Sequence, residues 1–412
     1  MGPTSKDTDI VIVGAGLTGL RAALEVSRAG LSVLVVERES AVGGRIRSSR
    51  VDGFILDHGF QVILSGYPEL ATLPSLGPLR CKAFTPGARI RLDGKNHDLI
   101  DPRHKPSSVL RTLFSPIVSL RDIFGLACMI ARAPKSPEPP CRHSTSDYLT
   151  RRRFSQLFRG AFLEPFLRGV LLDAQLSSDA RLARFYLKIF SQGKALLPEN
   201  GMQALPELLA TALGREHIIL NSPVAHLKSD RVVLSSGEEI RARRVICAAD
   251  ALSAAALGGP DQTSPHHGTV TMYFGANRPP YTEPLLMLNG DGRGPINNLC
   301  VPSNVQPSYA PPGKALICAS IVGSDAARPI NELEQRVRQQ LHYWFGSETT
   351  EWTTLKVFQM PSALPACPRL SAGFREVDGI IYAGDYLSYG SQNGALAAGR
   401  AVGSAVVINE VL

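Results

Sequence analysis

The chain has 412 residues, of which 44% are apolar and 19% charged, and its formal net charge is +8. This balance is typical of a globular protein with a large core and excludes an intrinsically disordered chain. The apolar runs fall well short of the ~20 residues of a membrane-spanning helix, and the first residues (MGPTSKDTDI) lack the apolar centre of a signal peptide.

The first predicted elements form a β-α-β unit. Residues 9–13 (DIVIV) are an apolar, β-branched run of strand length. Apolar residues then recur every three or four positions over residues 17–30, which predicts a helix. A second apolar strand follows over residues 31–36. A unit of this size with a glycine-rich first turn is typical of a dinucleotide-binding fold.

The glycine-rich turn has the GxGxxG spacing, with Gly14, Gly16 and Gly19. Gly14 permits the tight turn, Gly16 lets the backbone approach a pyrophosphate, and Gly19 allows close packing of helix and strand. The N–H groups at the start of the helix attract the phosphates. Glu37 ends the second strand, where its carboxylate would accept both hydroxyls of a ribose and repel a 2′-phosphate. With the adjacent Arg38, these residues predict a site for FAD or NAD and disfavour NADP.

A second glycine turn follows as Gly43-Gly44-Arg45. NAD does not require a glycine turn directly beyond the acidic residue. The turn resembles the GG-R motif of the flavin amine oxidase superfamily, in which the glycines pass close to the FAD pyrophosphate and the arginine supports it. The resemblance therefore implies FAD as the cofactor and gives these three residues the same roles.

Residues 53–70 (GFILDHGFQVILSGYPEL) resemble one branch of this superfamily, the plant-type phytoene desaturases and squalene-associated FAD enzymes. Gln61 stands where many members carry His, which is a departure from the pattern. The candidate catalytic residues here are His58, Gln61 and Tyr67. The imidazole of His58 titrates near working pH and would serve as a general base; the alternative is a hydrogen-bonded structural group in a glycine-rich turn.

Residues 101–160 are strongly basic, with eleven Lys or Arg against four Asp or Glu. Two short apolar helices are predicted over residues 106–134, the second beginning at Ser115–Pro116 as N-cap and first helical residue. Another helix is predicted from residue 151 to 158. We interpret residues 103–153 as a basic amphipathic insert that contacts a membrane surface; the alternative is a cap packed on the protein's own core. No recognition motif for nucleic acid is present.

The next informative segment, residues 198–250, is predicted to hold a helix to Leu213 followed by short strands. The resemblance implies that the backbone of Val224 contacts the adenine. Amine oxidases of this superfamily usually carry a lysine that holds a water against the flavin. The strand that looks equivalent, residues 268–275, has none, and Lys356 is the nearest substitute, which disfavours polar amine oxidation.

The C-terminal segment predicts a strand, a Gly384-Asp385 turn and a helix from Gln392 rich in Gly and Ala. In the superfamily, the acidic residue after Ala-Gly binds the ribitol chain, and the helix start contacts the N1/O2 edge of the flavin. The resemblance gives these roles to Asp385 and to the backbone of Gln392, with Gly384 and Asn393 beside them. Asn393 stands where Glu is common.

The seven cysteines are scattered, which predicts reduced thiols, no structural zinc and no other metal site. A second GxGxxG and a CxxxxC pair are both absent, so an NADPH-fed disulfide reductase is disfavoured. Electrons would leave to oxygen or a quinone. No cysteine adjoins the C-terminal motif, and we therefore expect FAD to be bound noncovalently.

We therefore predict an α/β fold in which a Rossmann-like FAD-binding lobe is interleaved with a mixed α+β substrate-binding lobe. The first interpretation of function is dehydrogenation or desaturation of a lipophilic, isoprenoid-like substrate, in a cytoplasmic protein that also contacts the membrane surface. The alternatives are an amine or amino-acid oxidase that forms hydrogen peroxide and a non-catalytic flavoprotein. The oligomeric state is not indicated. The FAD lobe is predicted at 1–80, 198–260 and 365–412, and the substrate lobe at 81–197 and 261–364.

Overall fold

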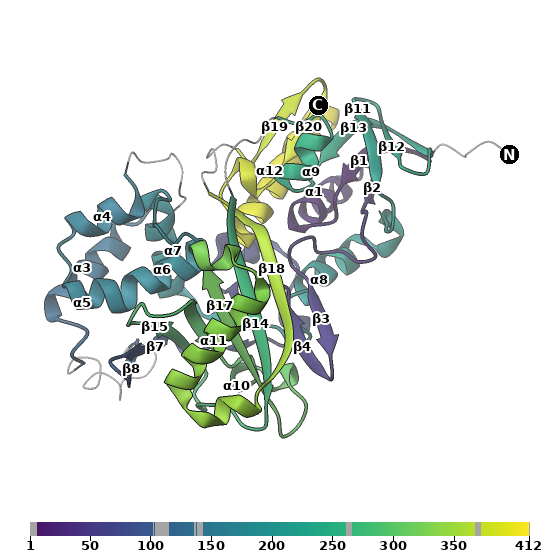
Figure 1. Cartoon of the computed structure of the whole chain (residues 1–412). Coiled ribbons are helices and arrows are strands. Elements are labelled where there is room, and N and C mark those ends of the chain that lie inside the picture. Colours follow the sequence, from purple (N-terminus) through teal and green to yellow (C-terminus); the bar gives the residue numbers. More distant parts are fainter. Residues whose placement is uncertain are drawn as a thin grey trace.

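A computed structural model describes residues 6–101, 103, 115–135, 137, 143–260, 266–366 and 372–411. It contains two large sheets with helices packed against each, and a separate group of helices beside them (Figure 1). This arrangement confirms the predicted α/β class. The predicted lobe boundaries stay a prediction, and the first of the two predicted insert helices lies outside the described residues.

The larger sheet has eight strands, in the order β10-β2-β1-β13-β12-β11, with β20 also paired to β13 and β19 to β20. Its centre is parallel, because β1 lies between β2 and β13 and all three run the same way. The Val and Ile residues of β1 are buried, as expected for a parallel strand covered on both faces. The strands are β1 (Lys6–Val13), β2 (Val33–Val36), β10 (Ile218–Ile219), β11 (Val224–Lys228), β12 (Arg231–Leu234), β13 (Glu239–Cys247), β19 (Phe374–Val377) and β20 (Ile380–Ala383).

Two helices from opposite ends of the sequence pack closely on this sheet. Helix α1 (Leu17–Arg28) lies against α12 (Gln392–Val411). Small residues allow the approach: a Cβ added at Gly399 of α12 would lie 2.4 Å from the Thr18 carbonyl oxygen. The Thr18 hydroxyl also donates to the Ala395 carbonyl at 3.0 Å. Helices α8 (Ala204–Leu213) and α9 (Ala251–Ala256) complete the group.

The second sheet has seven strands, in the order β18-β14-β17-β16-β15-β7-β8. Helix α11 (Ile330–Phe345) covers one face (Figure 1), where Val337 and Leu341 join the apolar cluster that contains Met272 and Ile317. The opposite face is turned toward the cavity described below. The strands are β7 (Gly87–Leu92), β8 (Lys95–Ile100), β14 (His266–Ala276), β15 (Leu286–Asn289), β16 (Ile296–Cys300), β17 (Ala315–Val322) and β18 (Thr353–Pro365).

Most of the remaining helices gather on one side of the second sheet, at the left of Figure 1. They are α3 (Leu120–Ala131), α4 (Thr145–Arg151), α5 (Gln156–Phe158), a π-helix (Arg159–Leu163), α6 (Glu164–Leu171) and α7 (Ala180–Gln192). The short helix α10 (Pro302–Val305) lies apart from them, at the bottom of the figure. The short strands are β3 (Ser48–Val51), β4 (Phe54–Asp57), β5 (Ile63–Leu64), β6 (Lys82–Ala83) and β9 (Ala195–Leu197).

Two helix starts predicted in the basic region are wrong. Helix α3 begins after Ser119, because Ser119 and Asp122 form a reciprocal capping box that Ser115–Pro116 cannot match. The arginines at 151–153 end α4 instead of starting a helix, since Arg153 adopts a left-handed conformation and Ser155 caps the next helix. Among the described helices, none combines the length and hydropathy needed to cross a membrane.

Candidate functional site

A cavity of about 1670 Å³ lies between the two sheets and is lined by residues from both. Small-molecule sites usually measure ≈ 300–1,000 Å³. This cavity is therefore large enough for a dinucleotide together with a second molecule. It extends from the glycine turn after β1 to the cavity-facing side of the second sheet and the helices beside it.

One end of the cavity has the geometry of a dinucleotide site. Gly14 has a φ of +103°, which a side chain would strain. A Cβ at Gly16 would meet no protein atom within 4 Å and would project from a position that lines the cavity. The buried carboxylate of Glu37 accepts hydrogen bonds from the Ala15 amide at 2.7 Å and the Glu39 amide at 3.0 Å, which fixes it at the end of β2.

Most of the residues predicted to bind the cofactor line this cavity. Gly19 does not: its Cβ would lie 1.9 Å from the Gly14 carbonyl oxygen, in agreement with a packing role. Asn393 does not either, because its side chain accepts from the Glu69 amide and donates to the Tyr389 hydroxyl. Those that line it are Gly14, Gly16, Glu37, Arg38, Gly43, Gly44, Arg45, Val224, Gly384, Asp385 and Gln392.

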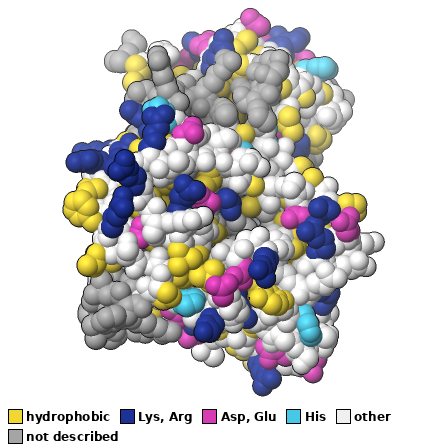
Figure 2. Space-filling model, turned by 60° about the vertical axis from the view of Figure 1, so that its left-hand side comes forward, with side chains coloured by type: hydrophobic (Ala, Val, Ile, Leu, Met, Phe, Trp, Pro, Cys, Tyr) yellow, Lys and Arg dark blue, Asp and Glu magenta, His cyan; other side chains and the backbone are white. Residues whose placement is uncertain are grey.

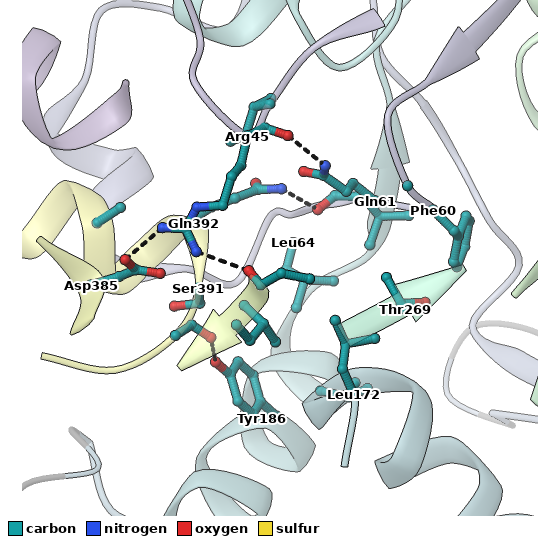
Figure 3. Close-up of a pocket in the computed structure, with 18 of the residues that line it drawn as sticks. Arg45, Phe60, Gln61, Leu64, Leu172, Tyr186, Thr269, Asp385, Ser391 and Gln392 are labelled. Carbon is teal, nitrogen blue, oxygen red and sulfur yellow. Dashed lines mark hydrogen bonds and ion pairs between the residues drawn. The ribbon is translucent and has the colours of Figure 1, made fainter. Parts of the chain in front are cut away.

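An ion pair joins the two predicted motifs across the cavity. A guanidinium nitrogen of Arg45 lies 2.6 Å from Asp385 Oδ1, and another donates to the Ala363 carbonyl at 2.8 Å (Figure 3). Burial lowers the pKa of Arg45, but Asp385 outweighs it and raises the pKa overall. The residues that the resemblance assigned to pyrophosphate and ribitol are therefore neighbours in space, although 340 positions separate them.

The start of α12 presents a polar atom without a partner. Gln392 donates to the Val62 carbonyl at 3.1 Å, while its buried Oε1 has no hydrogen bond in the described part of the chain. Buried polar atoms are normally paired, so this one indicates a missing ligand. Together with the open space at Gly16 and the carboxylate at Glu37, it shows that these residues fit an FAD.

The three candidate catalytic residues also line the cavity. His58 Nε2 lies 2.7 Å from the Ser49 hydroxyl, and burial, with smaller effects of Arg47 and Lys356, lowers the pKa of His58. The Gln61 amide donates to two backbone carbonyls. Burial raises the pKa of Tyr67 well above its usual range, so its hydroxyl stays protonated.

The far end of the cavity is apolar and aromatic, and sequence reasoning missed it. Phe158, Phe162, Phe166 and Phe190 form a chain of rings whose centroids lie 5.3, 6.0 and 5.0 Å apart in that order. All four line the cavity. The i, i+4 spacing of the first three was the available signal, since it places them on one helical face. The close-up shows Phe60, Leu172 and Thr269 on the side opposite Arg45, Asp385 and Gln392 (Figure 3).

Each carboxylate at the cavity already has a partner. Asp101 is bonded to Arg103 and Asp385 to Arg45. The others bind arginines, a serine or backbone amides. Among the described residues, the carboxylates that line the cavity are Glu37, Glu39, Asp101, Asp250 and Asp385.

The two lysines relevant to amine chemistry lie in different places. Lys356 on β18 is exposed and does not line the cavity. Lys194, just before β9, does line it, and its backbone amide donates a hydrogen bond to the Ser65 hydroxyl at 2.8 Å. Sequence reasoning did not single out Lys194.

The rim of the cavity carries exposed apolar side chains on α3. Leu120 and Phe124 are 76% and 72% exposed, while Ile123 is both exposed and part of the cavity lining. Figure 2 shows this face, on which Lys and Arg side chains gather close to hydrophobic ones. The exposed basic residues on α3, after it and near the end of α4 are Arg121, Arg132, Arg151 and Arg153.

Comparison with known proteins gives a family match over almost the whole chain. A sequence profile described as flavin containing amine oxidoreductase matches residues 17–407. Putrescine oxidase of Kocuria rosea is 27% identical over 246 residues, covering 55% of this chain and 50% of that protein. Protoporphyrinogen oxidase 2 of Arabidopsis thaliana is 27% identical over 165 residues, covering 39% and 32%. The chain thus aligns with about half, or less, of these curated relatives.

Solved structures share the fold. An oxidoreductase from Methanosarcina mazei superposes with a TM-score of 0.74 at 18% identity, covering 95% of this chain and 98% of that one. Identity this low bears on the fold alone. The match shows that the two proteins share the fold over nearly their whole lengths.

Proposed function

This chain belongs to the family of flavin-containing amine oxidoreductases, and we propose that it is an FAD-dependent oxidoreductase acting on a neutral, apolar substrate. The observation that carries the proposal is the lining of the far, apolar end of the cavity. Phenylalanine rings line it, and every carboxylate at its described surface is already bonded to another group. An ammonium substrate would lose its hydration there and find no free carboxylate to pair with. The binding of such a charged group would therefore cost free energy.

The residues of this chain have distinct tasks in such a reaction. The turn at Gly14 and Gly16, with the start of α1, holds the pyrophosphate, and Glu37 holds the ribose. Asp385 would bind the ribitol chain. A bound FAD would supply the hydride acceptor, at N5 of its flavin ring. The phenylalanine rings bind the substrate chain and exclude water.

A dehydrogenation also releases a proton, and His58 is the group that we propose to accept it. Its lowered pKa keeps the imidazole neutral near pH 7, as a base requires. Tyr67, held protonated by burial, acts as a hydrogen-bond donor to the reacting groups. Both N–H groups of the Gln61 amide are used by backbone carbonyls, so Gln61 offers its carbonyl oxygen as an acceptor. The acceptor that reoxidises the flavin is oxygen or a quinone.

Amine oxidation is the second candidate, because the putrescine oxidase relative and the cavity residue Lys194 favour it. An anaerobic titration of the yellow protein separates the two candidates. Solubilised polyprenyl compounds, amines and amino acids are added in turn while flavin absorbance is followed. Bleaching by a polyprenyl compound supports the proposal. Bleaching by amines alone overturns it, and a flavin that only dithionite reduces points to a non-catalytic flavoprotein.

We also propose that the rim helix α3 contacts an anionic membrane surface, from which an apolar substrate enters the cavity. Leu120 and Phe124 would insert among the lipid chains, and Arg121 and Arg132 would attract the headgroups. Sedimentation with liposomes tests this contact. Binding to vesicles with phosphatidylserine, reduced in the Phe124→Ser variant and by high salt, supports it; equal recovery in the supernatant with and without vesicles overturns it.

A further inference from the structure

The cavity-facing side of the second sheet carries a row of polar residues. In the register of β14, β17 and β16, Thr271 is paired with Ser320, and Ser320 with Asn298. Side chains of directly paired residues lie on the same face of a sheet. The neighbours Ile317, Ala319 and Ile321 lie on the other face, packed under α11. The row therefore faces the substrate half of the cavity.

The two threonines on this face of β14, Thr271 in the row and Thr269 beside it, have hydrogen-bond partners. Thr271 Oγ1 accepts from the Phe60 amide at 3.3 Å. The Thr269 hydroxyl donates to the Ile321 carbonyl at 2.9 Å. The fold explains these two hydroxyls, because each forms a hydrogen bond with a backbone group.

Ser320 differs from them. Its side chain is 5% exposed and lines the cavity, and its Oγ has no partner within the described residues. Asn298, 4% exposed, also lines the cavity; its Oδ1 accepts from the Asn297 amide at 2.9 Å. A buried hydroxyl without a partner costs free energy and calls for an explanation. Other parts of the cavity wall are aromatic. A buried polar pair in this wall costs free energy unless a ligand forms hydrogen bonds with it.

Helix α6 packs closely against Asn298 on one side of this pair. Gly169 of α6 lines the cavity, and a Cβ there would lie 3.0 Å from Asn298 Oδ1. A larger residue would press against the asparagine. Glycine therefore lets α6 pack against Asn298 without displacing its side chain from the cavity wall.

We propose that Ser320 and Asn298 anchor a neutral oxygen, a hydroxyl or carbonyl, that the apolar substrate carries. The serine hydroxyl can donate or accept, and the asparagine amide nitrogen donates, so the pair suits an uncharged oxygen. No charge is needed to satisfy it. This inference rests on the proposed function: it names the polar part of the substrate whose apolar part fills the aromatic wall.

The test compares two probes with the same carbon skeleton, farnesol and farnesene; farnesene lacks the hydroxyl and carries one more C=C bond. Binding to the oxidised holoprotein is followed anaerobically by the change in flavin absorbance. We expect farnesol to bind about tenfold more tightly than farnesene, a difference in line with one or two hydrogen bonds in a dry site. Ser320→Ala should weaken farnesol about fivefold and leave farnesene unchanged.

Two further variants make the result specific. Thr269→Val is the matched control, because it removes a cavity-lining hydroxyl that already has a backbone partner; it should keep the preference for farnesol. Asn298→Leu should reduce that preference to a similar extent as Ser320→Ala, in which the expected tenfold preference falls to about twofold. Equal binding of both probes by the wild type, or an unchanged preference in Ser320→Ala, overturns the anchor. If neither probe binds while amines bleach the flavin, the proposed function itself is wrong.

Discussion

The substitution Gly16→Ala isolates cofactor binding from folding. Gly16 has a φ of −74°, which alanine adopts without strain, and its added Cβ would meet no protein atom within 4 Å. The free energy of unfolding of the apoprotein should therefore stay the same or rise by about 0.4–1 kcal/mol, because alanine restricts the unfolded chain more than glycine does. The same methyl group occupies the space into which the pyrophosphate must come. We expect FAD affinity to fall at least tenfold, or about 1.4 kcal/mol.

The assay is titration of apoprotein with FAD, followed by quenching of flavin fluorescence, beside thermal unfolding of the apoprotein. Gly160→Ala is the matched control, since its Cβ also meets nothing within 4 Å and Gly160 does not line the cavity. Gly19→Ala gives the contrasting result: its Cβ would lie 1.9 Å from the Gly14 carbonyl oxygen. This overpacking should cost about 1–3 kcal/mol of stability. FAD affinity within twofold of wild type in Gly16→Ala would refute the assigned position of the pyrophosphate.

Three other changes test the site and its surroundings. Burial raises the pKa of Asp57 to about 6, so the native state holds a proton that the unfolded state has lost between pH 4 and 6. The free energy of unfolding should therefore fall by about 3 kcal/mol as pH rises through this window; urea denaturation should show this fall in wild type and not in Asp57→Asn. The lowered pKa of His58 predicts that anaerobic flavin reduction stays constant as pH falls through 6.5 and declines only below it; a decline centred above 6.5, or the same profile in His58→Gln, would exclude His58 as the base. Asp385→Ala should release FAD on gel filtration, while the distant exposed Asp230→Ala should retain it; equal retention by both would contradict the ribitol assignment.

The dinucleotide end of the site could be predicted because its constraints are local. Positive φ at Gly14, close packing at Gly19 and an acidic residue at a strand end all appear in the sequence as residue types at fixed spacing. The family resemblance assigned Arg45 and Asp385 to two parts of one cofactor, but the ion pair between them was not predicted. The spacing of residues along the sequence does not show that two side chains 340 positions apart are in contact.

The substrate end could not be predicted in the same way. Ser320 looks like any strand serine in the sequence, and its importance arises from register with Asn298 and from a missing partner. The start of α3 was misplaced because both Ser115 and Ser119 are good caps, and the reciprocal bond to Asp122 decided between them. The sequence left two interpretations of the apolar residues of α3, a membrane contact or a cap on the protein's own core, since helical periodicity does not show which apolar face finds a partner; Phe124 is exposed in the structure.

The pairing of α1 with α12 sets the order of events during synthesis. The Thr18 hydroxyl meets the Ala395 carbonyl, and β1 needs β13 beside it, so the nucleotide-binding half stays incomplete while most of the chain is made. At 5–20 residues per second, the ribosome takes roughly 20–80 s between these two helices. Until then, the face of α1 that packs on α12 lacks its cover. FAD would thus enter after translation, and its supply would govern how much newly made protein escapes degradation.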